Sequence, residues 1–330
     1  MEALDFRLLN EFQRDFPLEP RPFAQIARRL RVDEATVLAA LRRLHEDGVV
    51  SRVGAVFAPR RIGASTLAAL AASPQRLEEI AARVSARPEV NHNYEREHRY
   101  NLWFVVTAQD QAHLSATLAA IENDTGCKLI SLPLEREFYI DLGFDLAGVC
   151  KAPHTAGRVE SAVFQRQTFA EQKLIGALQN GLELVSRPFA RLGEQTGMRE
   201  QEVIATLERW RGEGLIKRFG VVVRHHELGY TANAMVVWDL PDAEVERVGQ
   251  RLAAEPEVTL CYQRRRHPPE WTHNLFCMIH GRVRGDVEAA VERLRERLGL
   301  AETSCAVLFS RRRFKQRGAR YIPQAEAAHG

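Results

Sequence analysis

His92-Asn-Tyr-Glu-Arg-Glu-His-Arg-Tyr-Asn-Leu-Trp103 returns later in the chain in altered form, as Tyr262-Gln-Arg-Arg-Arg-His-Pro-Pro-Glu-Trp-Thr-His-Asn-Leu-Phe276. Both stretches contain Tyr-x-Arg and, a few residues later, Asn-Leu followed by an aromatic residue. The pattern is otherwise that of an inner strand, with a hairpin turn expected near residues 97–99. Because histidine, arginine and tyrosine crowd these strand-like segments, we expect the chemistry of the protein here.

The repeat extends over most of the chain at a nearly constant spacing. Its matched pairs are Arg21-Pro-Phe23 with Arg187-Pro-Phe189, Arg52-Val-Gly54 with Arg218-Phe-Gly220, and Gly63 with Gly229. Such self-similarity indicates two copies of one architecture. The second copy gains residues at His267-Pro-Pro-Glu270, so the halves are related but not equivalent.

Composition excludes several classes of protein. A net charge of only +3 argues against a polycation that binds nucleic acid indiscriminately, and 45% hydrophobic with 27% charged residues is typical of a soluble globular protein. The five cysteines are odd in number and lack C-x-x-C spacing, which argues against a disulfide framework or a thiolate metal site. No apolar run approaches membrane-spanning length. We expect a cytoplasmic protein without membrane contact.

Each half is expected to begin with a winged helix-turn-helix. Apolar residues at spacings of three and four predict helices over 5–15, 23–30 and 33–47, with Asp33 as a start and Gly48 as a stop. Residues 49–57 then alternate partly, as a strand or hairpin arm does.

The rest of each half reads as strand, helix, hairpin, helix, strand, the order of ferredoxin-like folds. The segments are 66–71, 74–86, 90–107, 111–125 and 128–138, and again 232–239, 242–254, 258–280, 286–298 and 303–313. The predicted class is α+β, a tandem duplication. Its expected parts are helix-turn-helix domains at 1–63 and 166–229, ferredoxin-like domains at 64–147 and 230–323, a linker at 148–165 and a tail at 324–330.

A helix-turn-helix followed by a ferredoxin-like domain resembles the Lrp/AsnC family, whose members are usually DNA-binding regulators. Within it, the two hairpin stretches, Phe138-Tyr-Ile-Asp-Leu-Gly-Phe144 and Ala232-Asn-Ala-Met-Val-Val-Trp238 are similar to siroheme decarboxylases of heme d1 and alternative heme biosynthesis. The halves resemble that family's two subunit types. The resemblance therefore implies a fused internal pseudo-dimer, and it is compatible with a further homodimer.

The resemblance implies a carboxy-lyase that removes two acetate carboxyl groups from siroheme, giving 12,18-didecarboxysiroheme and CO2. It implies no separate cofactor, because the iron belongs to the substrate. Arginine suits the eight carboxylates of siroheme because it stays charged and can grip carboxylates bidentately. The expected substrate-binding residues are Arg52, His92, Tyr94, Arg96, Asn101, Trp103, Arg218, His225, Arg264, Arg266, Trp271, Asn274 and Lys315.

The carbanion-like carbon left by CO2 needs a proton donor, for which histidine and tyrosine are suited. The candidates are His98 and Tyr100 in the first half and Tyr262 and His273 in the second. His92 is a secondary candidate for an axial ligand of the siroheme iron, and no other metal is expected. Leu260 stands where the first half has His92, and His273 where it has Tyr100, so the two pockets are expected to differ.

Other interpretations stay open at this point. The polar strand residues could be the solvated face of a sheet, Arg52 and Arg218 could form surface ion pairs, and Lys315 could belong to a solvated basic end. The alternative function is an Lrp/AsnC-type DNA-binding regulator sensing a small ligand or heme, and a third is a tetrapyrrole carrier. Acidic residues open both presumptive recognition helices, which is unfavourable beside a phosphate backbone, so we expect no DNA binding.

Overall fold

A computed structural model describes residues 2–58, 61–140, 167–224 and 229–321, and in it each half opens with three helices and a strand. These are α1 (Ala3–Glu11), α2 (Pro22–Leu30), α3 (Glu34–Glu46) and β1 (Val50–Phe57), then α6 (Phe169–Leu178), α7 (Pro188–Thr196), α8 (Glu200–Gly212) and β7 (Ile216–Val223). Asp33 caps α3 by accepting a 2.6 Å hydrogen bond from the amide of Thr36. Gly48, with φ of +77°, turns the chain out after α3. The predicted start and stop of this helix are confirmed.

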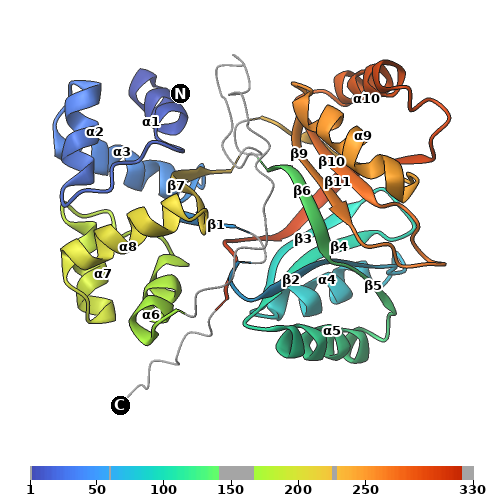
Figure 1. The fold of residues 1–330 in the computed structure, drawn as a ribbon, viewed down its shortest axis with the longest axis horizontal. Coiled ribbons are helices and arrows are strands. Elements are labelled where there is room, and N and C mark those ends of the chain that lie inside the picture. Colours follow the sequence, from blue (N-terminus) through green and yellow to red (C-terminus); the bar gives the residue numbers. More distant parts are fainter. Residues whose placement is uncertain (1, 59–60, 141–166, 225–228, 322–330) are drawn as a thin grey trace.

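The two strands that were expected to form separate wings pair with each other instead. β1 and β7 run antiparallel, with Gly54 opposite Gly220. A Cβ atom on Gly220 would lie 2.3 Å from the carbonyl oxygen of Phe12, so only glycine fits this close approach. Leu8, Phe23 and their repeat partners Leu174 and Phe189 share one buried core. The two helix-turn-helix units therefore form a single helical lobe, at the left of Figure 1.

The remaining elements form the second lobe. They are β2 (Ala64–Leu70), α4 (Leu77–Ala86), β3 (Val90–Arg96), β4 (Leu102–Ala108), α5 (Gln111–Thr125), β5 (Leu129–Leu132), β6 (Leu134–Ile140), β8 (Ala232–Trp238), α9 (Asp242–Ala254), β9 (Val258–Arg264), β10 (Leu275–Gly281), α10 (Arg284–Leu298) and β11 (Cys305–Gln316). The expected ferredoxin-like order is present in both halves, and both predicted hairpins form, as β3–β4 and β9–β10.

The halves do not keep separate sheets, because they exchange their last strands. One nine-stranded sheet has the order β5-β2-β4-β3-β11-β8-β10-β9-β6, so β11 of the second half pairs with β3 and β6 of the first half pairs with β9. The prediction of a single strand over 128–138 was wrong. Pro133, which has no amide donor, separates β5 from β6, and the two strands pair with different halves. The exchange makes the chain an internal pseudo-dimer.

The sheet curls until its two edges meet. β5 and β6 occupy opposite edges, yet only Pro133 separates them along the chain. Helices α4, α5, α9 and α10 lie outside the sheet (Figure 1). The helix-free face encloses a core whose members come from both halves, among them Leu67, Trp103, Met235, Trp271, Phe276 and Leu308.

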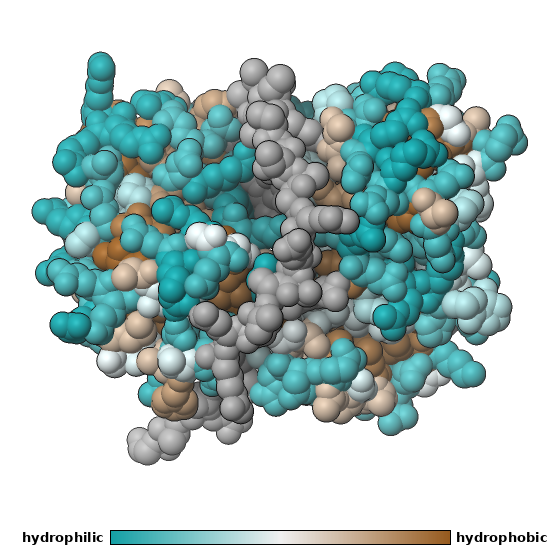
Figure 2. Space-filling view, in the orientation of Figure 1, coloured by the Kyte–Doolittle hydropathy of each residue, from teal (hydrophilic) through white to brown (hydrophobic). Residues whose placement is uncertain are grey.

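Hydrophilic residues cover most of both lobes on the face seen in Figure 2. Many of the charged residues form ion pairs with residues close by in the chain, such as Arg7 with Glu11 at 2.7 Å and Arg247 with Glu244 at 3.0 Å. Within the described ranges, no helix combines the length and apolar character needed to cross a bilayer.

Candidate functional site

The residues that both halves retain hold the hairpins together. The side-chain amide of Asn101 accepts from the amide of Ala72 and donates to its carbonyl, both at 2.9 Å. Asn274 makes the same two bonds to Leu240, both at 3.0 Å. Each asparagine thus clamps the backbone that follows a neighbouring strand, and this explains why both copies keep it. Substrate binding by Asn101 and Asn274 stays a prediction.

Two retained arginines lie on the helix-free face and each donates to a carbonyl across the sheet. Nη1 of Arg96 donates to Leu308 at 3.0 Å, and Nη1 of Arg264 donates to Leu132 at 2.8 Å. Burial lowers the pKa of both guanidinium groups, and the Nε atom of each is buried without a hydrogen-bond partner. Within the described part of the chain, neither has a carboxylate at ion-pair distance.

Each of these arginines lies against a tyrosine ring. The guanidinium carbon of Arg96 is 5.8 Å from the ring centroid of Tyr94, and that of Arg264 is 4.6 Å from the ring centroid of Tyr262. Burial raises the pKa of Tyr94, whereas the positive charges of Arg96 and Arg313 oppose that rise. The phenol of Tyr94 therefore keeps its proton at neutral pH.

A second group, which we call the hairpin cluster, consists of His98, Tyr100, Trp103, Trp271 and His273. Trp271 is its centre, with ring centroids 5.3 Å from His98, 5.1 Å from Trp103 and 5.0 Å from His273. Three of these rings come from the first half and two from the second. The residues predicted for two separate pockets therefore meet in one place, at the turn ends of the two hairpins.

The two histidines of the hairpin cluster both have a lowered pKa. Burial lowers the pKa of His98, and the charges of Arg99 and His273 lower it further. Burial also lowers the pKa of His273, against the opposing charge of Asp239. Nε1 of Trp271 and Nδ1 of His273 are buried without partners, so this cluster presents two unused polar atoms.

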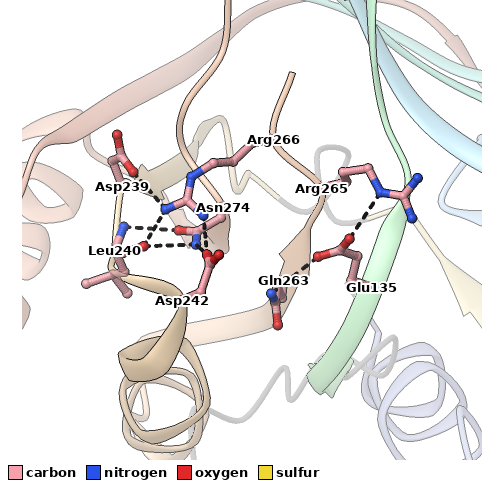
Figure 3. A network of polar contacts seen from close by, with 8 residues as sticks. All are labelled: Glu135, Asp239, Leu240, Asp242, Gln263, Arg265, Arg266 and Asn274. Carbon is pink, nitrogen blue, oxygen red and sulfur yellow. Dashed lines mark hydrogen bonds and ion pairs between the residues drawn. The ribbon is translucent and has the colours of Figure 1, made fainter. Parts of the chain in front are cut away.

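Arg265 and Arg266, which follow β9, are paired with carboxylates (Figure 3). Arg266, predicted to bind substrate, donates to Asp239 at 3.0 Å and also bonds to Asp242. Asn274 reaches the same Asp242 carboxylate at 3.1 Å. Arg265 donates to Glu135 at 3.1 Å. These two arginines therefore offer little free positive charge to a substrate carboxylate.

His92 lies away from the hairpin cluster, at the other end of β3. Arg96 lies four positions further along the extended strand, a span of roughly 13 Å. Its ring is nearly parallel to that of Tyr94, with centroids 6.3 Å apart and an interplanar angle of 12°. Predicted site residues thus occupy two places, and ligation of the siroheme iron by His92 stays a prediction.

Lys315 faces away from His92 and Tyr94. It is paired with Asn93, which bonds to the carbonyl of Ala81 in α4 at 3.2 Å, and Lys315 itself donates to the carbonyls of Ser85 and Arg87. Both side chains therefore lie on the helix-covered face, and substrate binding by Lys315 stays a prediction. Burial and nearby Arg317 and Arg320 lower the pKa of Lys315 to about 8.

The two arginines of the paired strands β1 and β7 bond locally. Arg52 donates to the carbonyl of Ala55 at 3.1 Å, and Arg218 donates to Val221 at 3.4 Å and to Gln13 at 3.3 Å. Burial lowers the pKa of Arg52, which has no ion pair within the described ranges. Substrate binding by Arg52 and Arg218 stays a prediction. His225, a further predicted site residue, lies outside the described residues.

Sequence reasoning missed two residues beside these groups. Arg313 is paired with Tyr94, and Tyr321 packs edge-on against Phe57 of the helical lobe with ring centroids 6.2 Å apart. Arg313 lies in the same basic stretch as Lys315, but its position opposite Tyr94 depends on the strand exchange. No group of three or more His, Cys, Asp or Glu side chains among the described residues could hold a metal ion.

The acidic starts of α3 and α8 are engaged within the helical lobe. Glu34 accepts from Arg21 at 2.6 Å and from Ser186 at 2.9 Å, and Glu200 pairs with Arg187. These carboxylates are thus bonded to other residues of the helical lobe. The absence of DNA binding stays a prediction.

Two family models match the chain, each of them twice. The AsnC-like ligand binding domain matches residues 61–139 and 227–315, and the siroheme decarboxylase NirDL-like HTH domain matches 5–50 and 171–217. The siroheme decarboxylase NirDL subunit of Paracoccus denitrificans is 48% identical over 97% of both chains. In Stutzerimonas stutzeri, the siroheme decarboxylase NirL and NirD subunits are separate proteins. They are 49% and 53% identical to this chain, over 44% of it in each case and over 86% and 96% of their own lengths.

Solved structures agree over the full length. A crystal structure of the siroheme decarboxylase NirDL superposes with a TM-score of 0.71 at 29% identity, covering 97% of this chain and 95% of that one. A co-complex of NirDL with an iron-uroporphyrin III analogue gives a TM-score of 0.70 at 27% identity, covering 96% and 93%.

Proposed function

The chain belongs to the siroheme decarboxylase family, and on that premise we propose that it is a carboxy-lyase that removes two acetate carboxyl groups from siroheme. The products would be 12,18-didecarboxysiroheme and CO2, in the biosynthesis of heme d1 or an alternative heme. The iron belongs to the substrate, and no separate cofactor is proposed. A cytoplasmic location, expected from the sequence, is part of the same proposal.

Positive charge without a carboxylate partner is the observation that carries this proposal. Arg52, Arg96 and Arg264 are buried or half-buried, and none forms an ion pair in the described ranges. By contrast, Arg247, Arg265 and Arg266 are each paired with Asp or Glu. Leaving a buried charge uncompensated costs several kcal/mol unless a partner binds. A substrate with eight carboxylates would supply that partner.

Departure of CO2 leaves an electron pair on the acetate methylene, which must gain a proton to become a methyl group. His98, Tyr100, Tyr262 and His273 are the proposed donors. Both imidazoles are neutral at pH 7 because burial lowers their pKa, so each must first take up a proton to act as a strong acid. Tyr262 lies against Arg264, a cation that would stabilise the phenolate formed when the ring gives up its proton.

Arginines would orient the carboxylates that do not react, and a site of low polarity would weaken solvation of the one that leaves. Trp103, Trp271 and Phe276 offer the aromatic surface for a flat macrocycle. Trp103 and Trp271 are almost fully buried in the core of the curled sheet. The proposed stacking on these rings would therefore require the hairpin turns to open when substrate binds.

The proposal is tested by anaerobic incubation of the purified full chain with siroheme, followed by mass spectrometry of the tetrapyrrole. Loss of two CO2 equivalents is the expected result. Binding without a change in mass would replace the proposal with a carrier function. A chain that neither binds nor changes siroheme would contradict both.

The charge argument has its own test. Arg52→Gln and Arg264→Gln should each weaken siroheme binding about tenfold, the size expected for one hydrogen bond to a charged group. The matched control is Arg247→Gln, because Arg247 is exposed on α9 and already paired with Glu244. Equal effects of all three substitutions would show that the uncompensated charges are not special.

A further inference from the structure

A short segment after β11 crosses from the sheet lobe to the helical lobe, and we call residues 317–321 the crossing segment. At its start, the amide of Arg317 donates to the carbonyl of Asn91 in β3 at 2.9 Å. At its end, Tyr321 is buried in the core of the helical lobe, where its ring centroid lies 6.2 Å from that of Phe57. The crossing segment therefore ties the two lobes to each other.

The crossing segment lies against Arg52 of β1. A Cβ atom on Gly318 would lie 2.8 Å from Nη1 of Arg52, so only glycine permits this approach without moving the guanidinium group. Burial raises the pKa of Tyr321 to about 12, against the opposing charge of Arg52. The phenol therefore keeps its proton at neutral pH and leaves the charge of Arg52 uncompensated.

The internal repeat provides a matched comparison for Arg52. Arg218 holds the same position in the second half, and Gln13 and Gln179 are a further matched pair. Both arginines donate to the carbonyl of the residue three positions on, at 3.1 Å and 3.4 Å. Arg218 also donates to the side-chain oxygen of Gln13 at 3.3 Å. If the halves were equivalent, Arg52 would bond to Gln179 in the same way.

The crossing segment removes this equivalence. Oε1 of Gln179 accepts the backbone amide of Tyr321 instead, and Nε of Arg52 is buried without a hydrogen-bond partner. The turn that follows Gln179 nevertheless lies against the arginine, because a Cβ atom on Gly181 would be 2.8 Å from Cβ of Arg52. The amide of Tyr321 thus occupies the acceptor that the repeat assigns to Arg52.

We infer that Tyr321 is a positioning residue for Arg52, because its amide occupies Gln179 and thereby leaves the Arg52 guanidinium group available to a carboxylate of the substrate. This inference rests on the proposed function for the substrate-binding role of Arg52. The buried ring is the anchor that holds the amide in place, so the side chain matters although the backbone makes the bond.

Tyr321→Ala removes the anchor and should let Gln179 bond to Arg52. Titration of the full chain with iron uroporphyrin should show an affinity about tenfold weaker, the size expected for one hydrogen bond to a charged group. Tyr321→Phe keeps the ring and should bind within about twofold of the natural chain. A natural affinity in Tyr321→Ala, or an equal loss in Tyr321→Phe, would overturn the inference.

Double substitutions separate positioning from a general loss of packing. In a chain that carries Gln179→Leu the competing acceptor is gone, so adding Tyr321→Ala should cost about twofold or less in affinity. In a chain that carries Arg52→Gln, adding Tyr321→Ala should likewise change little, because the residue that it positions is gone. A full tenfold loss in either background would show that Tyr321 acts only on the fold.

Gly318→Ala tests the same contact without emptying the core of the helical lobe. The added methyl group should displace the guanidinium group of Arg52 and weaken binding about tenfold, while thermal melting stays that of the natural chain. Gly285→Ala on α10 is the matched control, because a Cβ atom there meets nothing within 4 Å. An affinity that Gly318→Ala leaves unchanged would also contradict the positioning role.

Failure of this inference is distinguishable from failure of the proposed function. If siroheme keeps its mass but the loss caused by Tyr321→Ala disappears in the Arg52→Gln background, decarboxylation is refuted and the positioning role is kept. If siroheme loses CO2 but the two losses add, the function is kept and the positioning role is refuted. A chain that binds no iron uroporphyrin would refute the positioning role as well.

Discussion

Nη1 of Arg96 donates a 3.0 Å hydrogen bond to the carbonyl oxygen of Leu308, a residue of the other half of the chain. The reciprocal bond runs from Arg264 of the second half to Leu132 of the first, at 2.8 Å. The two halves are thus joined by the same contact made twice, across the strands that they exchange. The side chains that recur in the sequence are the ones at this junction.

Replacing Arg96 should weaken siroheme binding while leaving the stability of the fold nearly unchanged. Arg96→Met removes the bond to Leu308 but also removes a buried charge that has no carboxylate partner, and these two effects on stability oppose each other. We expect the free energy of unfolding to change by no more than about 1 kcal/mol, while siroheme affinity falls about tenfold. Urea denaturation and a binding titration measure the two quantities. A large loss of stability with normal affinity would make Arg96 a structural residue only.

Trp271 should be the largest contributor to the stability of the hairpin cluster. It is 2% exposed and contacts the rings of His98, Trp103 and His273. Trp271→Ala should lower the free energy of unfolding by roughly 3–5 kcal/mol, the usual cost of emptying an aromatic site. Phe169→Ala is the control, because Phe169 is 73% exposed. A cost below about 1 kcal/mol for Trp271→Ala would show that the hairpin turns are loosely packed.

The two histidines of this cluster should make the protein less stable in mild acid. Folding lowers the pKa of His98 and His273 below the ordinary value of 6.5, so the unfolded chain binds more protons between that value and the folded pKa. Stability is therefore full above pH 6.5 and declines as the pH falls below it. Denaturation at several pH values, repeated with His98→Gln and His273→Gln combined, should show a shallower decline in the variant. An unchanged slope would assign the acid sensitivity to other groups.

The proton-donor assignment predicts a loss of turnover rather than of binding. His98→Ala or His273→Ala should reduce the rate of siroheme decarboxylation by about 10²-fold or more, the range expected for a general acid, with a smaller effect on affinity. Single-turnover measurements with saturating enzyme separate the two effects. If both variants retain full activity, the histidines are not the donors, and Tyr262→Phe and Tyr100→Phe become the variants to compare.

Local features of the fold were predictable because neighbouring residues encode them. The spacing of apolar residues and the cap at Asp33 located α3, and the polar turn near residues 97–99 located the β3–β4 hairpin. The repeat itself predicted two ferredoxin-like units. Of the candidate site, the sequence supplied the residue types, and it marked Arg96 and Arg264 as retained in both copies.

Partners far apart in the chain were decided only by the tertiary structure. Hydrophobic periodicity says which face of a strand is buried but not which strand lies beside it, so the exchange of β6 and β11 and the pairing of β1 with β7 were not predictable. Those pairings bring His98 next to Trp271 and His273. They also place His92 apart from this cluster and turn Lys315 to the opposite face of the sheet. The sequence by itself determined a duplicated α+β chain with a decarboxylase-like set of residues. Strand pairing over long distances determined which of those residues face one another, because it depends on how the whole core packs and not on any one segment.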